Sequence, residues 1–434
     1  MFFAPLSLGY LASYARKYCK EKHEFIIIDE TMRKDVEKRL REFKPDIVGV
    51  STLTTVSKRA FELAEFCKKN FDSLNVIGGI HATALREKVL DSSFDIAVVG
   101  EGEMTFAEIL DRKDLHSING ILFKEGDKII TTLPRELIKN IDDIPFPAWD
   151  LMDMESYISK KQQIPALRAR TINIITTRGC PYNCVFCSCS QSFGRAIRHN
   201  SPEYAEKMIE SLEKYNIEAI YFSDDTFTIN MPRLEKICAI MKRKKLKFFC
   251  LGRANLVNKE MLIMLKDSGC VQIAFGFESM SPKILAYLKK NTVTVEQNRN
   301  AVKLCKEIGL EIQPYFMIGS PNETREDIQM TVDFIDEEKI IPTIFVTNPY
   351  PGTELYDWCK DNGLVPEHVD WEKSLYDHRS DISASNILSK KEIARIYLDL
   401  NEKYYMKRSK VDVLRKILLR PRESLKMIID YVIK

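Results

Sequence analysis

Four of the 11 cysteines fall within ten positions, and three of them, Cys180, Cys184 and Cys187, have the spacing CxxxCxxC. Three thiolates at this spacing in one loop can converge on a single inorganic centre. Zinc would require a fourth ligand, usually from a second CxxC pair, and the chain has no second pair. A ferredoxin-type cluster would require a fourth cysteine, and Cys189 stands in an awkward CxC spacing. The pattern favours a 4Fe–4S cluster with one iron open to a substrate or cofactor, over a zinc site or unrelated thiols.

The composition is that of a globular protein: 434 residues, 45% hydrophobic and 29% charged, with 17 glycines and 17 prolines. At roughly 100–200 residues per domain, two or three units are expected. The net charge of +3 argues against general polyanion binding, so no nucleic-acid partner is expected. The sequence shows no apolar run of about 18 residues and no signal-peptide pattern, and the cysteines do not suggest a disulfide framework. A cytoplasmic location is therefore predicted.

The amino-terminal part alternates short aliphatic runs with helical spacing, which is typical of a doubly wound α/β domain. The runs end at Gly, Ser or Asp, residue types that suit loops at the carboxyl ends of parallel strands. They predict strands at 25–28, 47–50, 76–77 and 96–99, with helices at 8–20, 58–69 and 105–112. Ahead of the first helix the only candidate for a strand is the three-residue run at 1–3, so the strand that normally opens such a sheet is missing from the pattern.

A linker and a longer βα series follow. Hairpin-like runs occupy 118–143, and Pro145 and Pro147 favour an extended connection. The second series predicts strands at 172–176, 219–222, 248–251, 271–275, 312–317 and 343–347, with helices at 202–215, 232–242, 259–267, 295–308, 325–337 and 354–360. Six strands with six crossovers give a parallel sheet curled toward a barrel but two units short of closing. The predicted division of the chain is 1–117, 118–170, 171–365 and 366–434.

The cysteine motif after the first strand of a six-unit βα series resembles the radical S-adenosylmethionine (SAM) superfamily. The resemblance implies a partial (β/α)6 barrel whose open iron chelates the amino and carboxylate groups of SAM. The residues that it implies in SAM binding are Phe186, Asp224, Asp225, Arg253, Glu278, Ser279, Gly319 and Pro321. Carboxylates after the second strand suit an ammonium group. For the acidic residues the alternative is a cap or turn carboxylate, and for Arg253 a surface salt bridge.

Together with these motifs, the first α/β unit resembles the cobalamin-binding domain of cobalamin-dependent radical SAM enzymes. The P-L-x-x-G-Y-L-A-like opening at 5–12 and the strand-end elements at 49–52, 78–83 and 100–103 carry the resemblance. Glycines there allow a large ring to approach closely, and hydroxyls can bond its amides. The implied cobalamin-binding residues are Leu8, Gly9, Ser51, Thr52, Gly78, Gly79, His81, Gly100, Glu101 and Gly102. No D-x-H-x-x-G segment is present, so His81 is interpreted as a hydrogen-bonding loop residue rather than a cobalt ligand.

The expected fold class is therefore α/β: a Rossmann-like cobalamin-binding domain without its first strand, a partial (β/α)6 radical SAM barrel and a helical carboxyl-terminal region. The resemblance implies three cofactors, namely a 4Fe–4S cluster, SAM and cobalamin. It also implies a low-potential electron donor of the flavodoxin or ferredoxin type and a small-molecule or lipid substrate. The favoured function is methylation of an unactivated carbon by a methyltransferase. The alternatives are a non-methylating relative, such as an oxidative cyclase or a carbon–carbon coupling enzyme, and a non-catalytic cofactor-binding protein.

The carboxyl-terminal tail is basic and amphipathic. Residues 401–434 contain ten Lys or Arg and four acidic residues, a difference of +6. Apolar Val411, Leu414 and Leu418 stand at helical intervals among the bases. Such a segment can lie on anionic lipid, which would make the protein membrane-associated. A helix packed over the barrel mouth with a solvated basic face is the favoured alternative.

Overall fold

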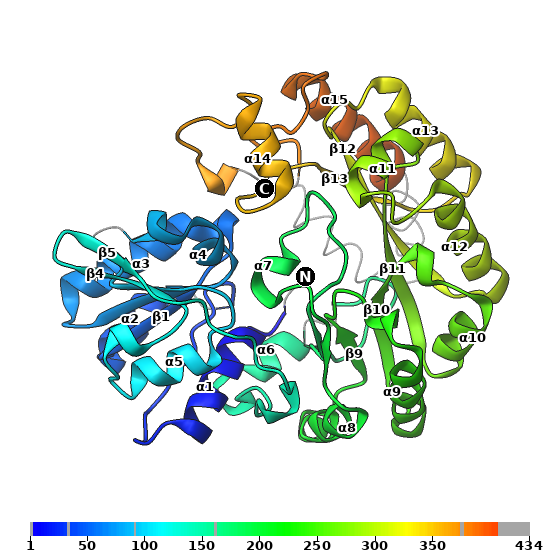
Figure 1. The fold of residues 1–434 in the computed structure, drawn as a ribbon. Coiled ribbons are helices and arrows are strands. Elements are labelled where there is room, and N and C mark those ends of the chain that lie inside the picture. Colours follow the sequence, from blue (N-terminus) through cyan, green and yellow to red (C-terminus); the bar gives the residue numbers. More distant parts are fainter. Residues whose placement is uncertain (1–2, 33–34, 91–92, 160–162, 374–376, 407–434) are drawn as a thin grey trace, which may run out of the picture.

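The fold is described by a computed structural model for residues 3–32, 35–90, 93–159, 163–373 and 377–406. Two separate sheets, each with its own helices, lie side by side and are joined by a linker (Figure 1). No helix within these ranges is long and apolar enough to cross a bilayer. The basic tail beyond residue 406, with its predicted lipid contact, lies outside the described residues.

The amino-terminal sheet has the order β1-β2-β3-β4-β5, with the first three strands parallel and the last two antiparallel. Its strands are β1 (Ile47–Ser51), β2 (Leu74–Gly78), β3 (Ile96–Val98), β4 (Ile121–Glu125) and β5 (Lys128–Thr131). The predicted hairpin therefore exists, and it extends this sheet, because β4 pairs with β3. The predicted domain boundaries remain a prediction, but the sheet itself continues past residue 117.

The predicted strand at 25–28 is wrong. This segment forms no strand, although Ile27 and Ile28 still pack against neighbouring apolar residues. Backbone N–H and C=O groups form a strand only when a neighbouring strand offers partners. Among the described residues β1 is the edge of the sheet, and residues 25–28 form no ladder with it, although Ile28 packs in the same cluster as Val48 of β1. Aliphatic composition brings the segment to the core but does not fix the backbone hydrogen bonds of a strand.

The second sheet confirms the partial barrel. Its six strands are all parallel in the order β13-β12-β11-β10-β9-β6. They are β6 (Thr171–Ile174), β9 (Ala219–Phe222), β10 (Lys247–Gly252), β11 (Cys270–Glu278), β12 (Glu311–Ile318) and β13 (Thr343–Val346). Each overlaps a predicted strand, because continuous apolar runs such as Phe248–Cys250 are fully buried.

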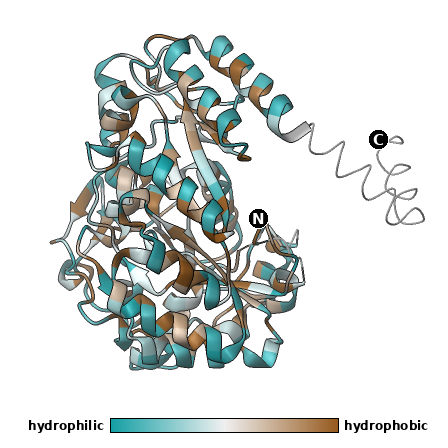
Figure 2. Cartoon of the chain, turned by 90° about the vertical axis from the view of Figure 1, so that its right-hand side faces the viewer, coloured by the Kyte–Doolittle hydropathy of each residue, from teal (hydrophilic) through white to brown (hydrophobic). Residues whose placement is uncertain are grey.

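Helices cover both sheets. Around the amino-terminal sheet lie α1 (Leu6–Tyr18), α2 (Val36–Phe43), α3 (Ser57–Asn70), α4 (Ile80–Leu85) and α5 (Glu103–Leu110). Around the barrel lie α8 (Pro202–Glu210), α9 (Met231–Lys244), α10 (Lys259–Asp267), α11 (Pro282–Lys289), α12 (Val295–Ile308), α13 (Arg325–Glu337) and α14 (Glu354–Asp361). Figure 2 shows hydrophilic and hydrophobic residues alternating along these helices, as expected of amphipathic helices on a core.

Shorter elements connect these layers. The linker contains α6 (Met154–Ile158), and the cysteine loop contains β7 (Thr177–Arg178), α7 (Cys189–Phe193) and β8 (Arg198–His199). The predicted helical tail begins as α15 (Lys390–Asn401), which starts at a capping box formed by Ser389 and Glu392. Ile393 of α15 packs against Gly319 in the loop after β12. The helix α15 thus packs on the barrel core beside the loop after β12.

Candidate active site

The cysteine loop follows β6 at the carboxyl end of the barrel sheet, where the sequence placed it. A short antiparallel pair, β7 with β8, forms its base. Gly179 has φ +88°, and a Cβ there would lie 2.3 Å from the carbonyl oxygen of Ala196. The turn into Cys180 therefore requires glycine, because other residues would be both strained and in collision.

The sulfur of Cys189 lies between those of Cys180 and Cys187. The Cys189 thiol donates its hydrogen to the Asp225 carboxylate over 2.7 Å. The contact with Cys189 is the main cause that lowers the pKa of Cys180 to about 6, and it also lowers the pKa of Cys187. A thiolate is the form that ligates iron, so this donor set fits a cluster. The CxC spacing of Cys189 is thus less awkward than the sequence suggested.

Arg253, at the end of β10, holds the cysteine loop in place. Its guanidinium lies 3.5 Å from the centre of the Tyr182 ring and donates to the Cys184 sulfur over 3.6 Å. The other donors reach Asn255 and Thr292. Arg253 is 8% exposed, so the alternative of a surface salt bridge is wrong. Its cation–π contact and its bond to sulfur position the cluster loop.

The two aspartates after β9 do different things. Asp224 is fully buried and accepts hydrogen bonds from Thr176 N, Thr176 Oγ1 and Thr177 N at 2.6–3.2 Å. Its carboxylate therefore fixes the start of the cysteine loop, as the turn alternative predicts. Asp225 is exposed and lies against Cys189, among the cluster sulfurs. Asp225, and not Asp224, therefore lies beside the cluster cysteines, where SAM is predicted to bind.

Glu278 ends β11 with φ +60°, a left-handed conformation that costs a non-glycine residue roughly 1–3 kcal/mol. Its carboxylate forms a buried ion pair with Lys289 Nζ at 2.7 Å, and the same ammonium lies 5.6 Å from the Phe186 ring centre. A Cβ at Gly276 would lie 2.3 Å from Glu278 Oε1, which explains the glycine of the G-x-E element. Lys289 was not predicted as a site residue, because it lies on α11, a helix that the sequence pattern did not predict.

The loop after β12 is held by a buried carboxyl group. Glu323 Oε2 accepts hydrogen bonds from Gly319 N and Ser320 N over 2.6 and 3.0 Å. Pro321 and Ser279 are also buried, and Ser279 Oγ accepts the N–H of Ser281. Burial is the main cause that raises the pKa of Glu323 to about 7. These buried residues fix the conformation of the loop after β12, which contains the predicted SAM contacts Gly319 and Pro321.

We expect Glu323 to make the protein less stable as the pH rises. Its folded pKa lies above the ordinary value of about 4.5, so the folded state binds more protons between about pH 4.5 and 7. Between pH 5 and pH 8 the free energy of unfolding of the wild type should fall relative to that of Glu323→Gln by on the order of 2 kcal/mol. Urea unfolding at both pH values measures this. Glu260→Gln, at an exposed position, should follow the wild type, and equal pH dependence in all three proteins would contradict the prediction.

Most of the predicted cobalamin contacts lie where β1, β2 and β3 of the amino-terminal sheet end, a region called here the cobalamin edge. Ser51 is exposed at the end of β1, whereas Thr52 is buried. Gly79 has φ +90°, and a Cβ there would lie 2.8 Å from Thr52 O. Gly78 precedes it at the end of β2. A Cβ at Gly100 (φ +81°) would meet nothing within 4 Å, so the space beside this backbone is open. Exposed hydroxyl, glycine backbone and open space fit the predicted approach of a corrinoid ring.

His81 is buried 3.2 Å from the hydroxyl of Thr54. Burial lowers the pKa of His81 to about 4, so the imidazole is neutral near pH 7. The prediction of a hydrogen-bonding residue agrees with this contact, but His81 lies in the first turn of α4 and not in a loop. Gly9 packs on the linker, where a Cβ would collide with Met152 and Pro147, and Gly102 packs on Leu11 of α1. These two glycines therefore serve helix packing, while Leu8 is half-buried in the first turn of α1.

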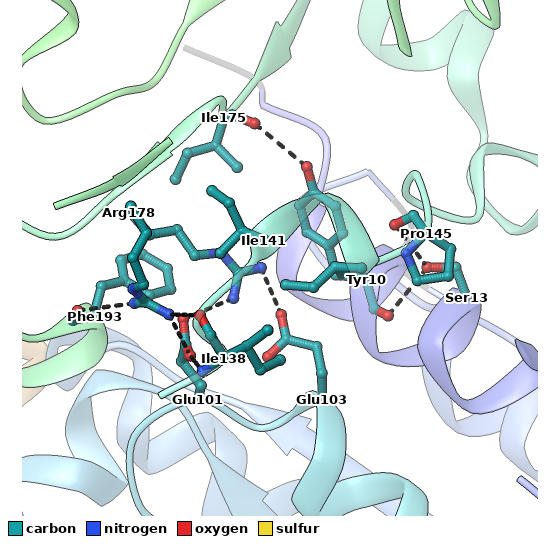
Figure 3. A network of polar contacts seen from close by, with 12 residues as sticks. Tyr10, Ser13, Glu101, Glu103, Ile138, Ile141, Pro145, Ile175, Arg178 and Phe193 are labelled. Atoms are coloured by element: carbon teal, nitrogen blue, oxygen red, sulfur yellow. Dashed lines mark hydrogen bonds and ion pairs between the residues drawn. The ribbon is translucent and has the colours of Figure 1, made fainter. Parts of the chain in front are cut away.

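A buried ion-pair network joins the cobalamin edge to the cysteine loop (Figure 3). Glu101 accepts hydrogen bonds from Arg178 Nη1 at 2.9 Å and Arg198 Nη1 at 2.8 Å, and Glu103 accepts one from Arg178 Nη2 at 2.6 Å. All four side chains are less than 10% exposed. Although burial opposes ionisation, the hydrogen bonds from Arg198 and Arg178 hold the pKa of Glu101 below its ordinary value. Glu101, predicted as a cobalamin contact, thus fastens its loop to the cysteine loop.

Comparison with known proteins agrees with this arrangement. The family model described as radical SAM superfamily matches residues 174–335, and that described as B12 binding domain matches residues 2–110. An uncharacterised methyltransferase of Pyrococcus horikoshii is 37% identical over 387 residues, which are 85% of this chain and 81% of the relative. An anaerobic magnesium-protoporphyrin IX monomethyl ester cyclase of Cereibacter sphaeroides is 27% identical, over 93% of this chain and 67% of the relative.

Among solved structures, the radical SAM methyltransferase TsrM of Kitasatospora setae, with cobalamin and a 4Fe–4S cluster bound, has the same fold. Its TM-score is 0.68 at 19% identity, over 82% of this chain and 73% of that one.

The two matched domains and the extent of the similarity define the class: the chain belongs to the cobalamin-dependent radical SAM enzymes. It is an enzyme whose cofactors are a 4Fe–4S cluster, SAM and cobalamin. Like other members of the superfamily, it acts on a small molecule and requires a reductant.

Proposed function

We propose that this enzyme methylates an unactivated carbon of a small molecule or lipid. The observation that carries the proposal is the ion-pair network that fixes the cobalamin-binding edge to the cysteine loop, in a chain 37% identical to a methyltransferase over most of both lengths. Methyl transfer by this class requires both cofactor sites to serve one substrate, and a rigid connection between the sites supports that.

In this proposal, Cys180, Cys184 and Cys187 hold the cluster, and Asp225 and Glu278 bind SAM. When bound, the cluster supplies the electron for cleavage of the sulfonium, and cobalamin supplies the methyl carrier. The remaining SAM contacts are Phe186, Ser279, Gly319 and Pro321, and the cobalamin contacts are Ser51, Thr52, Gly78, Gly79 and Gly100. Asp224 and Arg253 act by positioning, since Asp224 fixes the start of the cysteine loop at Thr176 and Arg253 donates to the Cys184 sulfur.

The charges that face SAM are set by buried partners. Lys289 orients the buried Glu278 carboxylate and balances its negative charge. The carboxylate can therefore be held toward SAM without an unpaired charge in a buried site. The aromatic ring of Phe186 packs on Ile284 and Leu288 beside the cluster loop, and these apolar groups exclude water from that side. A closed site matters because a carbon radical abstracts hydrogen from any nearby C–H bond, so competing molecules must be kept out. We also propose a flavodoxin or ferredoxin as the electron donor.

The test uses the enzyme reconstituted anaerobically with iron, sulfide and hydroxocobalamin. It is incubated with a reductant, methyl-deuterated SAM and a small-molecule extract of the source cells. We expect S-adenosylhomocysteine and 5′-deoxyadenosine to form together, and one extract component to gain the deuterated methyl group. Mass spectrometry measures all three. The matched control is the same reaction without hydroxocobalamin, in which the labelled product should be absent.

A non-methylating reaction is the second candidate, favoured by the similarity to the ester cyclase of Cereibacter sphaeroides. In that case 5′-deoxyadenosine would form in step with loss of a metabolite, and no product would carry label. That outcome would overturn methyl transfer and leave the radical SAM assignment intact.

A further inference from the structure

A second group of metal-ligating side chains lies away from the cofactor edges. Cys19 directly follows α1, His23 lies in the segment after it, and Asp111 directly follows α5. One ligand atom from each residue lies within 4.8 Å of the other two. Because α1 begins next to Ser51 and runs 13 residues, its far end is about 20 Å from the cobalamin edge. This trio is therefore distinct from the cobalamin edge.

The chemistry of the three groups selects a particular kind of cation. A thiol, an imidazole and a carboxylate together are a ligand set for zinc, whereas calcium and magnesium prefer oxygen atoms alone. Three protein ligands and a water complete a tetrahedral zinc site. The distances within the trio allow the donors to close around one ion with small side-chain movements.

The hydrogen-bonding state of the trio also indicates a ligand. His23 Nε2 is shielded from solvent and has no hydrogen-bond partner among the described residues, and such buried polar atoms normally have one. Asp111 Oδ1 accepts the N–H of Lys20 over 2.9 Å, which fixes the carboxylate. The Cys19 thiol contacts the carbonyl of Ala107 at 3.5 Å, a weak bond that a metal would replace.

We propose that Cys19, His23 and Asp111 bind one zinc ion that joins the carboxyl ends of α1 and α5. These helices carry the other side of the ion-pair network: Tyr10 of α1 lies under Arg178, and α5 begins at Glu103. The ion therefore stabilises the pair of helices on which the contact between the two sheets is built. The proposal does not depend on the reaction that the enzyme catalyses.

The experiment adds zinc to the cluster-loaded enzyme, in which iron occupies the cysteines of the cluster loop, and removes excess metal by gel filtration. We expect about one zinc per chain, and zinc-edge X-ray absorption should show a single sulfur at about 2.3 Å with nitrogen or oxygen ligands. Zinc should raise the thermal unfolding temperature of this protein. Cys19→Ser, His23→Ala and Asp111→Asn should each lower zinc retention at least tenfold while iron content stays at the wild-type level.

His116→Ala is the matched control, because His116 is an exposed imidazole of the same sheet region and pairs with Glu125. It should retain zinc as the wild type does. Three or four sulfurs per zinc would place the ion on the cluster cysteines and overturn the proposal. Failure to retain zinc, or equal retention by His23→Ala, would overturn it as well.

Discussion

Replacement of Cys180, Cys184 or Cys187 by alanine should abolish formation of 5′-deoxyadenosine from SAM. Each substitution removes one sulfur from a set of three, and a 4Fe–4S cluster bound by three cysteines has no spare protein ligand. We expect the iron content to fall from about four per chain to below one, and product formation to fall at least a thousandfold. Iron analysis, electron paramagnetic resonance of the reduced protein and chromatography of the nucleoside measure these effects.

Cys189→Ala is the matched control, because Cys189 lies in the same loop and its thiol contacts Cys180 and Cys187. It should keep the cluster and at least about a tenth of the cleavage activity. If Cys189→Ala lost iron as fully as Cys184→Ala, the ligand set would have to include Cys189. Hydroxocobalamin binding by all four variants, read from the absorbance, verifies that the amino-terminal sheet is intact.

Glu101→Gln should separate SAM cleavage from methyl transfer. Glu101 accepts hydrogen bonds from both Arg178 and Arg198, and a glutamine can neither balance their charges nor accept both bonds equally well. Disrupting a buried pair in this way costs about 3–5 kcal/mol, so the free energy of unfolding should fall by that order. The cobalamin edge would no longer be held against the cysteine loop. We expect the yield of methylated product per 5′-deoxyadenosine to fall at least tenfold.

The control for this prediction is Glu125→Gln, which alters an exposed glutamate on β4 of the same sheet. It should keep the wild-type stability and product ratio. Glu103→Gln should have an intermediate effect, because Glu103 accepts a hydrogen bond from Arg178, whereas Glu101 accepts one from each of the two arginines. An unchanged product ratio in Glu101→Gln would show that the network serves folding and not the coupling of the two sites.

Much of the barrel could be predicted from the sequence because its signals are local. A buried parallel strand needs a continuous apolar run, and runs such as Phe248–Cys250 are unambiguous. The helix α11 was missed although Ser281 and Pro282 form a normal helix start, with a cap hydrogen bond to Ile284 N. The run at 25–28 shows the opposite failure, because an aliphatic segment becomes a strand only beside another strand.

Residues of the candidate site could be predicted only where the residue type and its spacing alone indicate the role. The spacing of the three cysteines and the glycine at position 79, where φ is +90°, are visible in the sequence alone. The partners of Glu278 and Glu101 could not be found in this way, because Lys289 and Arg178 are brought to them by the fold. The roles of Asp224 and Arg253 likewise depend on which neighbours occupy their polar atoms, and local sequence does not reveal that.

The two units meet where Arg178 contacts Glu101 and Glu103 at the ends of their strands. They also meet along α1, because Leu6 packs on the barrel core and Tyr10 donates a hydrogen bond to Ile175 O. The loops outside this shared contact can be lengthened, shortened or exchanged during evolution without repacking it. A lineage built on this plan could acquire new molecules to modify while the machinery that handles the electron and the methyl group stays the same.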